Sequence, residues 1–153
     1  MTTTPATSIK PFREALPFSI CYILVFFVMI ERFADDVQTK AMFRLTAVLL
    51  NIILIACYII IVRLVVRGHR ELPLLKKAIW LYILTELIVF LFSGSPAVFG
   101  LYQRIIGSNS EVLDFREQRD FSFSLAAVIS SVVFYFWNRL RSRALSPQTP
   151  PHA

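Results

Sequence analysis

One carboxylate, Glu86, lies within an otherwise uncharged run and is the residue best placed to do chemistry inside a membrane. It stands nine residues beyond Lys77, in the segment LYILTELIVFLF. In a helix this spacing places it roughly 13 Å below the nearer interface, close to the midplane of a bilayer. An ionised carboxylate at that depth costs a few kcal/mol, so we expect Glu86 to be protonated or to accept hydrogen bonds.

Three other polar side chains are candidates for the same site. The depth arithmetic places Ser130 and Ser131 near the level of Glu86, and Asn51 about one turn further toward the outside. Two interpretations stay open. Glu86 carries protons, as in a proton-coupled transporter or channel, or it is a neutral acid that hydrogen-bonds Asn51 or serines of the last span and holds helices together. We prefer the second, because a single acid without a second ionisable partner makes a poor proton relay.

Other chemistries find little support in the sequence. It has no Gly-rich phosphate loop and no nucleophile elbow. Cys21 and Cys57 each fall within an apolar run and form no C-x-x-C pair. We therefore predict that the protein is not an enzyme and that it uses no metal and no cofactor. The net charge of +6 comes from residues beside apolar runs, so we expect no nucleic-acid partner.

The elements that must position these residues are transmembrane helices. The run from Leu45 to Val62 has eighteen residues without a charge, and its apolar residues surround the whole helix. The whole chain is 56% hydrophobic. We predict an all-α polytopic membrane protein with four transmembrane helices in a bundle. The expected spans are Ala15 to about Phe33, Leu45 to Val62, Leu74 to about Phe92, and Phe121 to Asn138.

Proline, glycine and charged residues mark the connections between these spans. Pro17 fits the first turn of the first span. Glu31 to Arg44 is expected to form a neutral loop. After the third span, residues 93–96 break the helix, and Pro96 favours a short interfacial helix that ends at Ile106. We predict disordered cytoplasmic tails at residues 1–14 and 141–153, on either side of a transmembrane domain at residues 15–140.

The distribution of basic residues predicts the orientation. The first tail, the middle loop and the residues from Arg139 onward carry ten of the sixteen Lys and Arg residues, and the other two loops carry six together with seven acids. By the positive-inside rule, both termini and the loop from Arg63 to Lys77 are cytoplasmic. We expect this basic loop to face anionic lipid. In a bacterium, this arrangement corresponds to the inner membrane.

Several features resemble those of a family of small bacterial inner-membrane proteins. The size, the four spans and three local features carry the resemblance. The local features are the basic connection from Arg67 to Pro73, the pair Ile79-Trp80, and the pair Tyr135-Phe136 followed by Arg141. In these respects the chain resembles the family grouped as domain of unknown function 2569. That family has no assigned activity, so the resemblance implies location and architecture only.

For function, the sequence favours a non-enzymatic membrane protein that acts by association. The partner would be a second copy of the chain or another membrane protein, because the loops are too short to fold a separate domain. The alternative is a small proton-coupled transporter or channel that uses Glu86.

Overall fold

The computed structural model describes residues 10–34, 36–67, 72–94, 97, 98, 102, 105 and 115–145. Within these residues it has no strand and four long helices: α1 (Lys10–Phe33), α2 (Val37–Arg67), α3 (Leu74–Ser93) and α5 (Phe115–Leu145). Three segments, Pro11–Arg32, Val37–Val65 and Gln118–Ala144, are long and apolar enough to cross a membrane. The predictions of an all-helical fold and a membrane protein are confirmed at this level. α3 carries three charged residues and is not among the three segments.

The connection between α1 and α2 is much shorter than predicted. α1 continues to Phe33 and α2 starts at Val37, so most of the stretch from Glu31 to Arg44 is helix, and the predicted loop was wrong. Glu31 forms ion pairs with Lys40, at 3.1 Å, and with Arg44. Because these charges pair across the hairpin, the helices extend beyond their apolar runs.

Asp36 begins α2 by accepting hydrogen bonds from Thr39. The Thr39 backbone N–H donates to Oδ2 at 2.9 Å, and the Thr39 hydroxyl donates to the same oxygen at 3.0 Å. An aspartate in this position satisfies one of the backbone donors left free at a helix start. The cap therefore places the start of α2 at Val37, well before the predicted start at Leu45.

α1 also starts earlier than predicted. It begins at Lys10 instead of Ala15, and Pro17 lies inside the helix instead of in its first turn. A proline removes one helical hydrogen bond and crowds the carbonyls of the preceding turn. Asn138 Nδ2 of α5 donates to the carbonyl of Glu14 in that turn, at 3.0 Å. Such contacts from neighbouring helices make proline tolerable in membrane helices.

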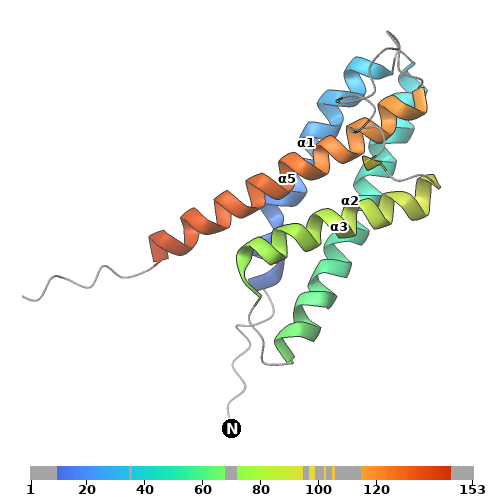
Figure 1. The fold of residues 1–153 in the computed structure, drawn as a ribbon. Coiled ribbons are helices and arrows are strands. Elements are labelled where there is room, and N and C mark those ends of the chain that lie inside the picture. The colour runs from blue at the N-terminus through green and yellow to red at the C-terminus, as the bar shows by residue number, and fades with distance from the viewer. Residues whose placement is uncertain are drawn as a thin grey trace, which may run out of the picture.

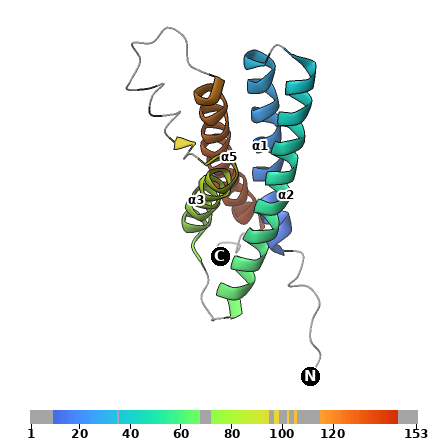
Figure 2. The ribbon, with the colours of Figure 1, turned by 90° about the vertical axis from the view of Figure 1, so that its right-hand side faces the viewer.

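α1 and α2 form an antiparallel hairpin (Figures 1 and 2). Asn51 Nδ2 donates to Ser19 Oγ at 2.8 Å, in the middle of the two helices. Toward the start of α1, the Tyr58 hydroxyl lies 3.5 Å from Glu14 Oε2. As residue numbers increase along α2, the numbers of the α1 residues that it contacts decrease, so the two helices are antiparallel.

α5 packs on α1 and also runs antiparallel to it. Its end contacts the start of α1 through Asn138 and Glu14, and near its start Phe123 stacks on Phe26 with ring centroids 4.5 Å apart. Because both α2 and α5 are antiparallel to α1, they run in the same direction.

α3 starts at the Glu14 end of the bundle and runs toward the start of α5. Lys77, in its first turn, lies 2.8 Å from Glu14, and Glu86 contacts Ser124 of α5. Figure 2 looks nearly along α3, which therefore crosses the α1–α2 hairpin at a steep angle. The helix ends at Gly94, where φ is 72° and the N–H donates to the Phe90 carbonyl.

The predicted helix from Pro96 to Ile106 lies mostly outside the described residues, as do residues 1–9 and 146–153 of the predicted tails. Of that helix, the structure describes residues 97, 98, 102 and 105. α5 begins at Phe115, before the predicted start at Phe121. Polar residues at its start extend the helix beyond the apolar run, as they do in α1 and α2.

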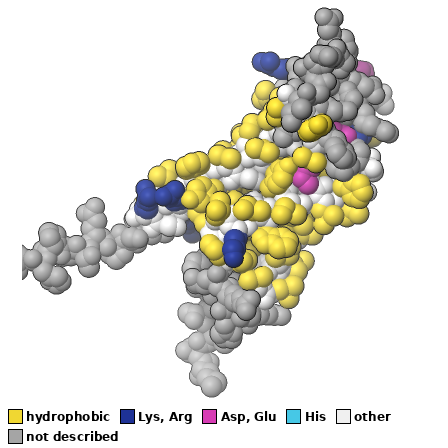
Figure 3. All heavy atoms as spheres, viewed as in Figure 1, with side chains coloured by type: hydrophobic (Ala, Val, Ile, Leu, Met, Phe, Trp, Pro, Cys, Tyr) yellow, Lys and Arg dark blue, Asp and Glu magenta, His cyan; other side chains and the backbone are white. Residues whose placement is uncertain are grey.

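An aromatic column on α1 forms the centre of the core. Phe18, Tyr22 and Phe26 recur every four residues, are at most 1% exposed, and stack on one another. α5 packs closely because its inward residues are small; Ser124, Ala126, Ala127 and Ser130 are fully buried. Large apolar side chains cover much of the outer surface visible in Figure 3, as expected for helices that face lipid.

Candidate functional site

Glu86 accepts hydrogen bonds from different parts of the chain, and the side chain of Tyr82, one turn earlier on α3, also hydrogen-bonds Glu86 and Ser124. Ser124 Oγ of α5 donates to Oε1 at 2.8 Å, and the backbone N–H of Val98 donates to Oε2 at 3.1 Å. The side chain is partly buried. Each carboxylate oxygen thus has a donor, and the bond to Ser124 ties α3 to α5. We call Glu86, Ser124 and the Val98 N–H the Glu86 site.

The structure does not bring Glu86 to the partners named from sequence. A serine of the last span is its partner, as one interpretation expected, but that serine is Ser124, six residues and about 9 Å of helix from Ser130. Depth arithmetic treated the helices as parallel to the membrane normal. The steep crossing of α3 breaks that assumption, since residues at equal depth on crossed helices need not meet.

Asn51 has a different partner. Its Nδ2 donates to both the hydroxyl and the carbonyl of Ser19, at 2.8 and 3.1 Å. The side chain is 2% exposed, and its Oδ1 has no hydrogen-bond partner within the described part of the chain. Asn51 therefore joins α1 to α2 and presents one unused acceptor to the core.

The hydroxyl groups of Ser130 and Ser131 are buried without partners. Both oxygens lack a hydrogen bond to any described residue, and so does the hydroxyl of Tyr22, which is 1% exposed. A buried polar atom left unpaired costs about 1–3 kcal/mol, and tyrosine hydroxyls usually find a partner when buried. The core therefore contains a set of unpaired polar atoms at Tyr22, Asn51, Ser130 and Ser131.

A second polar cluster joins all four helices, and sequence reasoning did not find it. Glu14 of α1 pairs with Lys77 of α3 at 2.8 Å and lies 3.5 Å from the Tyr58 hydroxyl of α2. Asn138 of α5 donates to the backbone carbonyl of Glu14. The two charged side chains are 25% and 18% exposed. We call these four residues the Glu14 cluster.

A signal for this cluster was present in the sequence. The inward stripe of α1 contains Phe18, Tyr22, Phe26 and Ile30, at intervals of four. One further interval toward the N-terminus gives Glu14, which the predicted tail had placed outside the bundle. Lys77, assigned to a loop that faces lipid, is instead paired with this carboxylate.

The bundle therefore contains Glu14 and Glu86 on either side of the unpaired polar atoms, and a third acid, Asp120 of α5, which is 5% exposed and pairs with Arg119 at 2.8 Å. Among the described residues, no group of three or more His, Cys, Asp or Glu side chains could hold a metal ion. Comparison of the chain with known protein families, with curated proteins and with solved structures finds no match.

Proposed function

We propose that the protein is a non-enzymatic four-span membrane protein that carries protons, with Glu86 as the carrier and both termini on one face. The observation that carries this proposal is the presence of two acidic positions in one bundle. Glu86 accepts hydrogen bonds from Ser124 and Val98, and the Glu14–Lys77 pair lies at the end where α1 begins. The objection raised by the sequence was the lack of a second ionisable partner, and the Glu14 cluster supplies one.

The directions of the helices support a fourth crossing. α2 and α5 are both antiparallel to α1, so the end of α2 and the start of α5 lie at opposite ends of the bundle. If α1, α2 and α5 cross the bilayer, the chain between Arg67 and Phe115 has to cross it as well. α3 runs in the required direction. Two of its three charged side chains have partners inside the bundle, because Lys77 pairs with Glu14 and Glu86 accepts a hydrogen bond from Ser124.

Charge supports the orientation predicted from the sequence. The end of the bundle that contains Glu14 also carries most of the described basic side chains. These are Arg13, Arg63, Lys76, Lys77, Arg139, Arg141 and Arg143. Basic residues of this kind mark the cytoplasmic face and attract anionic lipid. We propose a plasma-membrane location; the bacterial inner membrane rests on the resemblance to the family of domain of unknown function 2569.

Proton carriage requires only a simple step at Glu86. The carboxylate takes a proton from water on one side and releases it to water on the other, so it ends each cycle as it began. Glutamine has the same shape but cannot exchange a proton in this way. The carboxylate is partly exposed, and its donors come from α5 and from the segment after Gly94.

Action by association, which the sequence favoured, stays a prediction. The small residues of α5 that could have packed against another membrane protein are buried inside this bundle, against α1 and α3. Apolar faces of the other helices fit lipid as well as they fit a partner. The Glu86 site and the Glu14 cluster therefore support proton carriage more specifically than the apolar helix faces support association.

Proton flux into proteoliposomes tests the proposal. A pH gradient and a valinomycin-set potential drive uptake, which an internal pH dye reports. We expect flux with the wild type, none with Glu86→Gln, and wild-type flux with Glu31→Gln. The Glu31→Gln control removes an exposed carboxylate whose partners among the described residues, Lys40 and Arg44, lie across the α1–α2 hairpin. Absence of flux in the wild type refutes the function, and full flux in Glu86→Gln refutes the assignment of the carrier.

Reporter fusions test the four-span arrangement separately. Fusions after Arg67 and after Asn109 should report opposite faces, with Arg67 cytoplasmic. If both fusions report the same face, α3 does not cross the membrane.

A further inference from the structure

We propose that the core binds water between the Glu14 cluster and the Glu86 site, on the unpaired polar atoms of Tyr22, Asn51, Ser130 and Ser131. This inference rests on the proposed function, because the bound water would conduct protons between Glu14 and Glu86. Its structural claim, a hydrated section in an otherwise apolar bundle, can be tested without any measurement of flux.

The unpaired hydroxyls of Ser130 and Ser131 contrast with four other helical hydroxyls of the described chain, which bond to their own helix. The latter donate to the carbonyl four residues earlier; they belong to Thr46, Thr85, Ser122 and Ser142. Ser130 and Ser131 could make the same bond but do not. Their hydroxyls are therefore free to bind something else in the core, and they lie in neighbouring positions on α5.

The unpaired atoms are close to one another along the bundle axis. Asn51 is bonded to Ser19 of α1. α5 meets α1 at Asn138 beside Glu14 and at Phe123 beside Phe26, so its antiparallel register puts positions 130 and 131 opposite residues 19–22 of α1. Tyr22 lies in the same stretch. All four side chains therefore occupy about one helical turn of the core.

This turn lies between the two acidic positions. Along α1, Ser19 is about 7.5 Å beyond Glu14, and Tyr22 about 4.5 Å further. Phe26, which stacks on the residue before Ser124, is about 6 Å beyond Tyr22. One water with two hydrogen bonds of about 2.8 Å spans roughly 5.5 Å. One water therefore spans the step of about 4.5 Å, whereas the steps of about 7.5 and 6 Å need a second water or the reach of the side chains themselves.

Water is the ligand that fits these atoms. Buried waters typically make about three hydrogen bonds to polar groups that would otherwise be unsatisfied. Asn51 Oδ1 accepts, and the two serine hydroxyls and the Tyr22 hydroxyl both donate and accept. An ion would need a charged partner, and the charged side chains of the Glu14 cluster and the Glu86 site already pair with each other or with donors.

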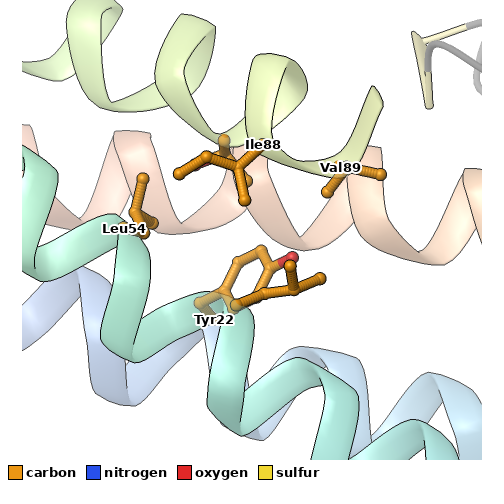
Figure 4. Close-up of a pocket in the computed structure, with 6 residues that line it drawn as sticks. Tyr22, Leu54, Ile88 and Val89 are labelled. Carbon is orange, nitrogen blue, oxygen red and sulfur yellow. The ribbon is translucent and has the colours of Figure 1, made fainter. Parts of the chain in front are cut away.

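Tyr22 lies where this line of polar groups meets a tightly packed part of the core. Its ring forms one wall of a slot whose other walls are Leu50 and Leu54 of α2 and Thr85, Ile88 and Val89 of α3 (Figure 4). The slot leaves no room for a water molecule in this conformation. Water on Asn51 and the serines does not extend through this slot in this conformation, so its connection to Glu86 requires the Tyr22 hydroxyl itself or a movement of α3.

The first test measures hydration by thiol exchange. In a chain with Cys21→Ser and Cys57→Ser, a single thiol is introduced at the core by Ser130→Cys or Ser131→Cys, and at the lipid face by Val132→Cys. Val132 lies at the same depth and is 50% exposed on the outer surface. Transfer into D₂O converts S–H to S–D where water reaches the thiol, and infrared absorption of the S–H stretch reports the rate.

We expect both core thiols to exchange at least roughly tenfold faster than the lipid-facing thiol, because exchange needs water and the ionised form. Equal, slow exchange at all three positions overturns the proposal, whatever the flux. Thermal unfolding in detergent identifies any variant that has lost its fold. If one of the two core variants has done so, the exchange rate of the other core thiol is compared with that of the lipid-facing thiol.

The second test connects the water to transport. The double variant Ser130→Ala, Ser131→Ala should reduce proton flux at least roughly tenfold, equivalent to about 1.4 kcal/mol of added barrier. Wild-type flux in this variant, together with loss of flux in Glu86→Gln, overturns the water path and leaves the proposed function in place. Lack of flux in the wild type overturns the function, and the exchange rates still decide the hydration.

Discussion

Removal of the Lys77 charge should destabilise the bundle by about 2 kcal/mol, because it leaves the Glu14 carboxylate without its cation. The variant Lys77→Met keeps most of the side-chain volume and removes the ammonium group. After the substitution, the Tyr58 hydroxyl at 3.5 Å is the remaining contact in the cluster to the carboxylate oxygen that Lys77 had bound.

The magnitude follows from the exposure of the pair. Exposed ion pairs contribute about 0.2–1 kcal/mol, whereas removing one partner of a fully buried pair costs about 3–5 kcal/mol. Glu14 is 25% exposed and Lys77 18% exposed, so the pair lies between these limits. The double variant Glu14→Gln, Lys77→Met should recover most of the loss, since no unpaired charge remains.

A double-mutant cycle in detergent, with unfolding followed by thermal or denaturant titration, measures the coupling energy. We expect about 1–2 kcal/mol for Glu14 with Lys77. The pair Glu31 and Lys40 is the matched control, because it also joins two helices at similar distance but Glu31 is 47% exposed. Its coupling should be below about 1 kcal/mol. A coupling near zero for Glu14 with Lys77 would refute the placement of Glu14 inside the bundle.

Two further predictions concern the helix ends. The hydrogen bond from the Thr39 backbone N–H, followed by that from its hydroxyl, lowers the pKa of Asp36 below its ordinary value of 3.8. The ionised cap therefore stabilises the fold above the unfolded pKa, and this contribution is lost as pH falls below 3.8 through the folded pKa. Asp36→Asn, which keeps a cap but cannot titrate, should lose less Tm than the wild type between about pH 5 and pH 3; equal losses would contradict the capping role. Gly94 has a φ of 72°, and apart from its chain neighbours no atom of the described residues lies within 4 Å of the position that a Cβ would occupy, so Gly94→Ala meets no steric clash with them. The substitution should cost only the backbone strain, about 1–2 kcal/mol in an unfolding titration, and an unchanged or raised stability would contradict that conformation.

The sequence predicted helices well where their cause is local. Long uncharged runs have to be helical in a bilayer, and this reasoning located most of α1, α2, α3 and α5. It also recognised that the residues around Gly94 end α3. The predicted bounds failed at Lys10, Val37 and Phe115, where polar residues continue the helices. Helix ends depend on caps and on pairs such as Asp36 with Thr39, which hydropathy does not measure.

The partners of polar side chains were harder to predict because they depend on how helices cross. Glu86 was identified from its depth, and a serine of the last span was the expected kind of partner. Which serine it meets is set by the angle between α3 and α5, and a single sequence contains no direct measure of that angle. Glu14 was missed for another reason, since Pro17 suggested a helix start near Ala15, whereas α1 begins at Lys10.

The measurement that tests proton carriage most directly compares two replacements of one side chain. Potential-driven proton flux would be measured in vesicles that contain equal amounts of wild type, Glu86→Asp and Glu86→Gln. Aspartate keeps a carboxyl group one methylene further from Ser124, so we predict reduced but measurable flux for Glu86→Asp and none for Glu86→Gln. Equal flux in all three proteins would contradict the role of Glu86 as the proton carrier.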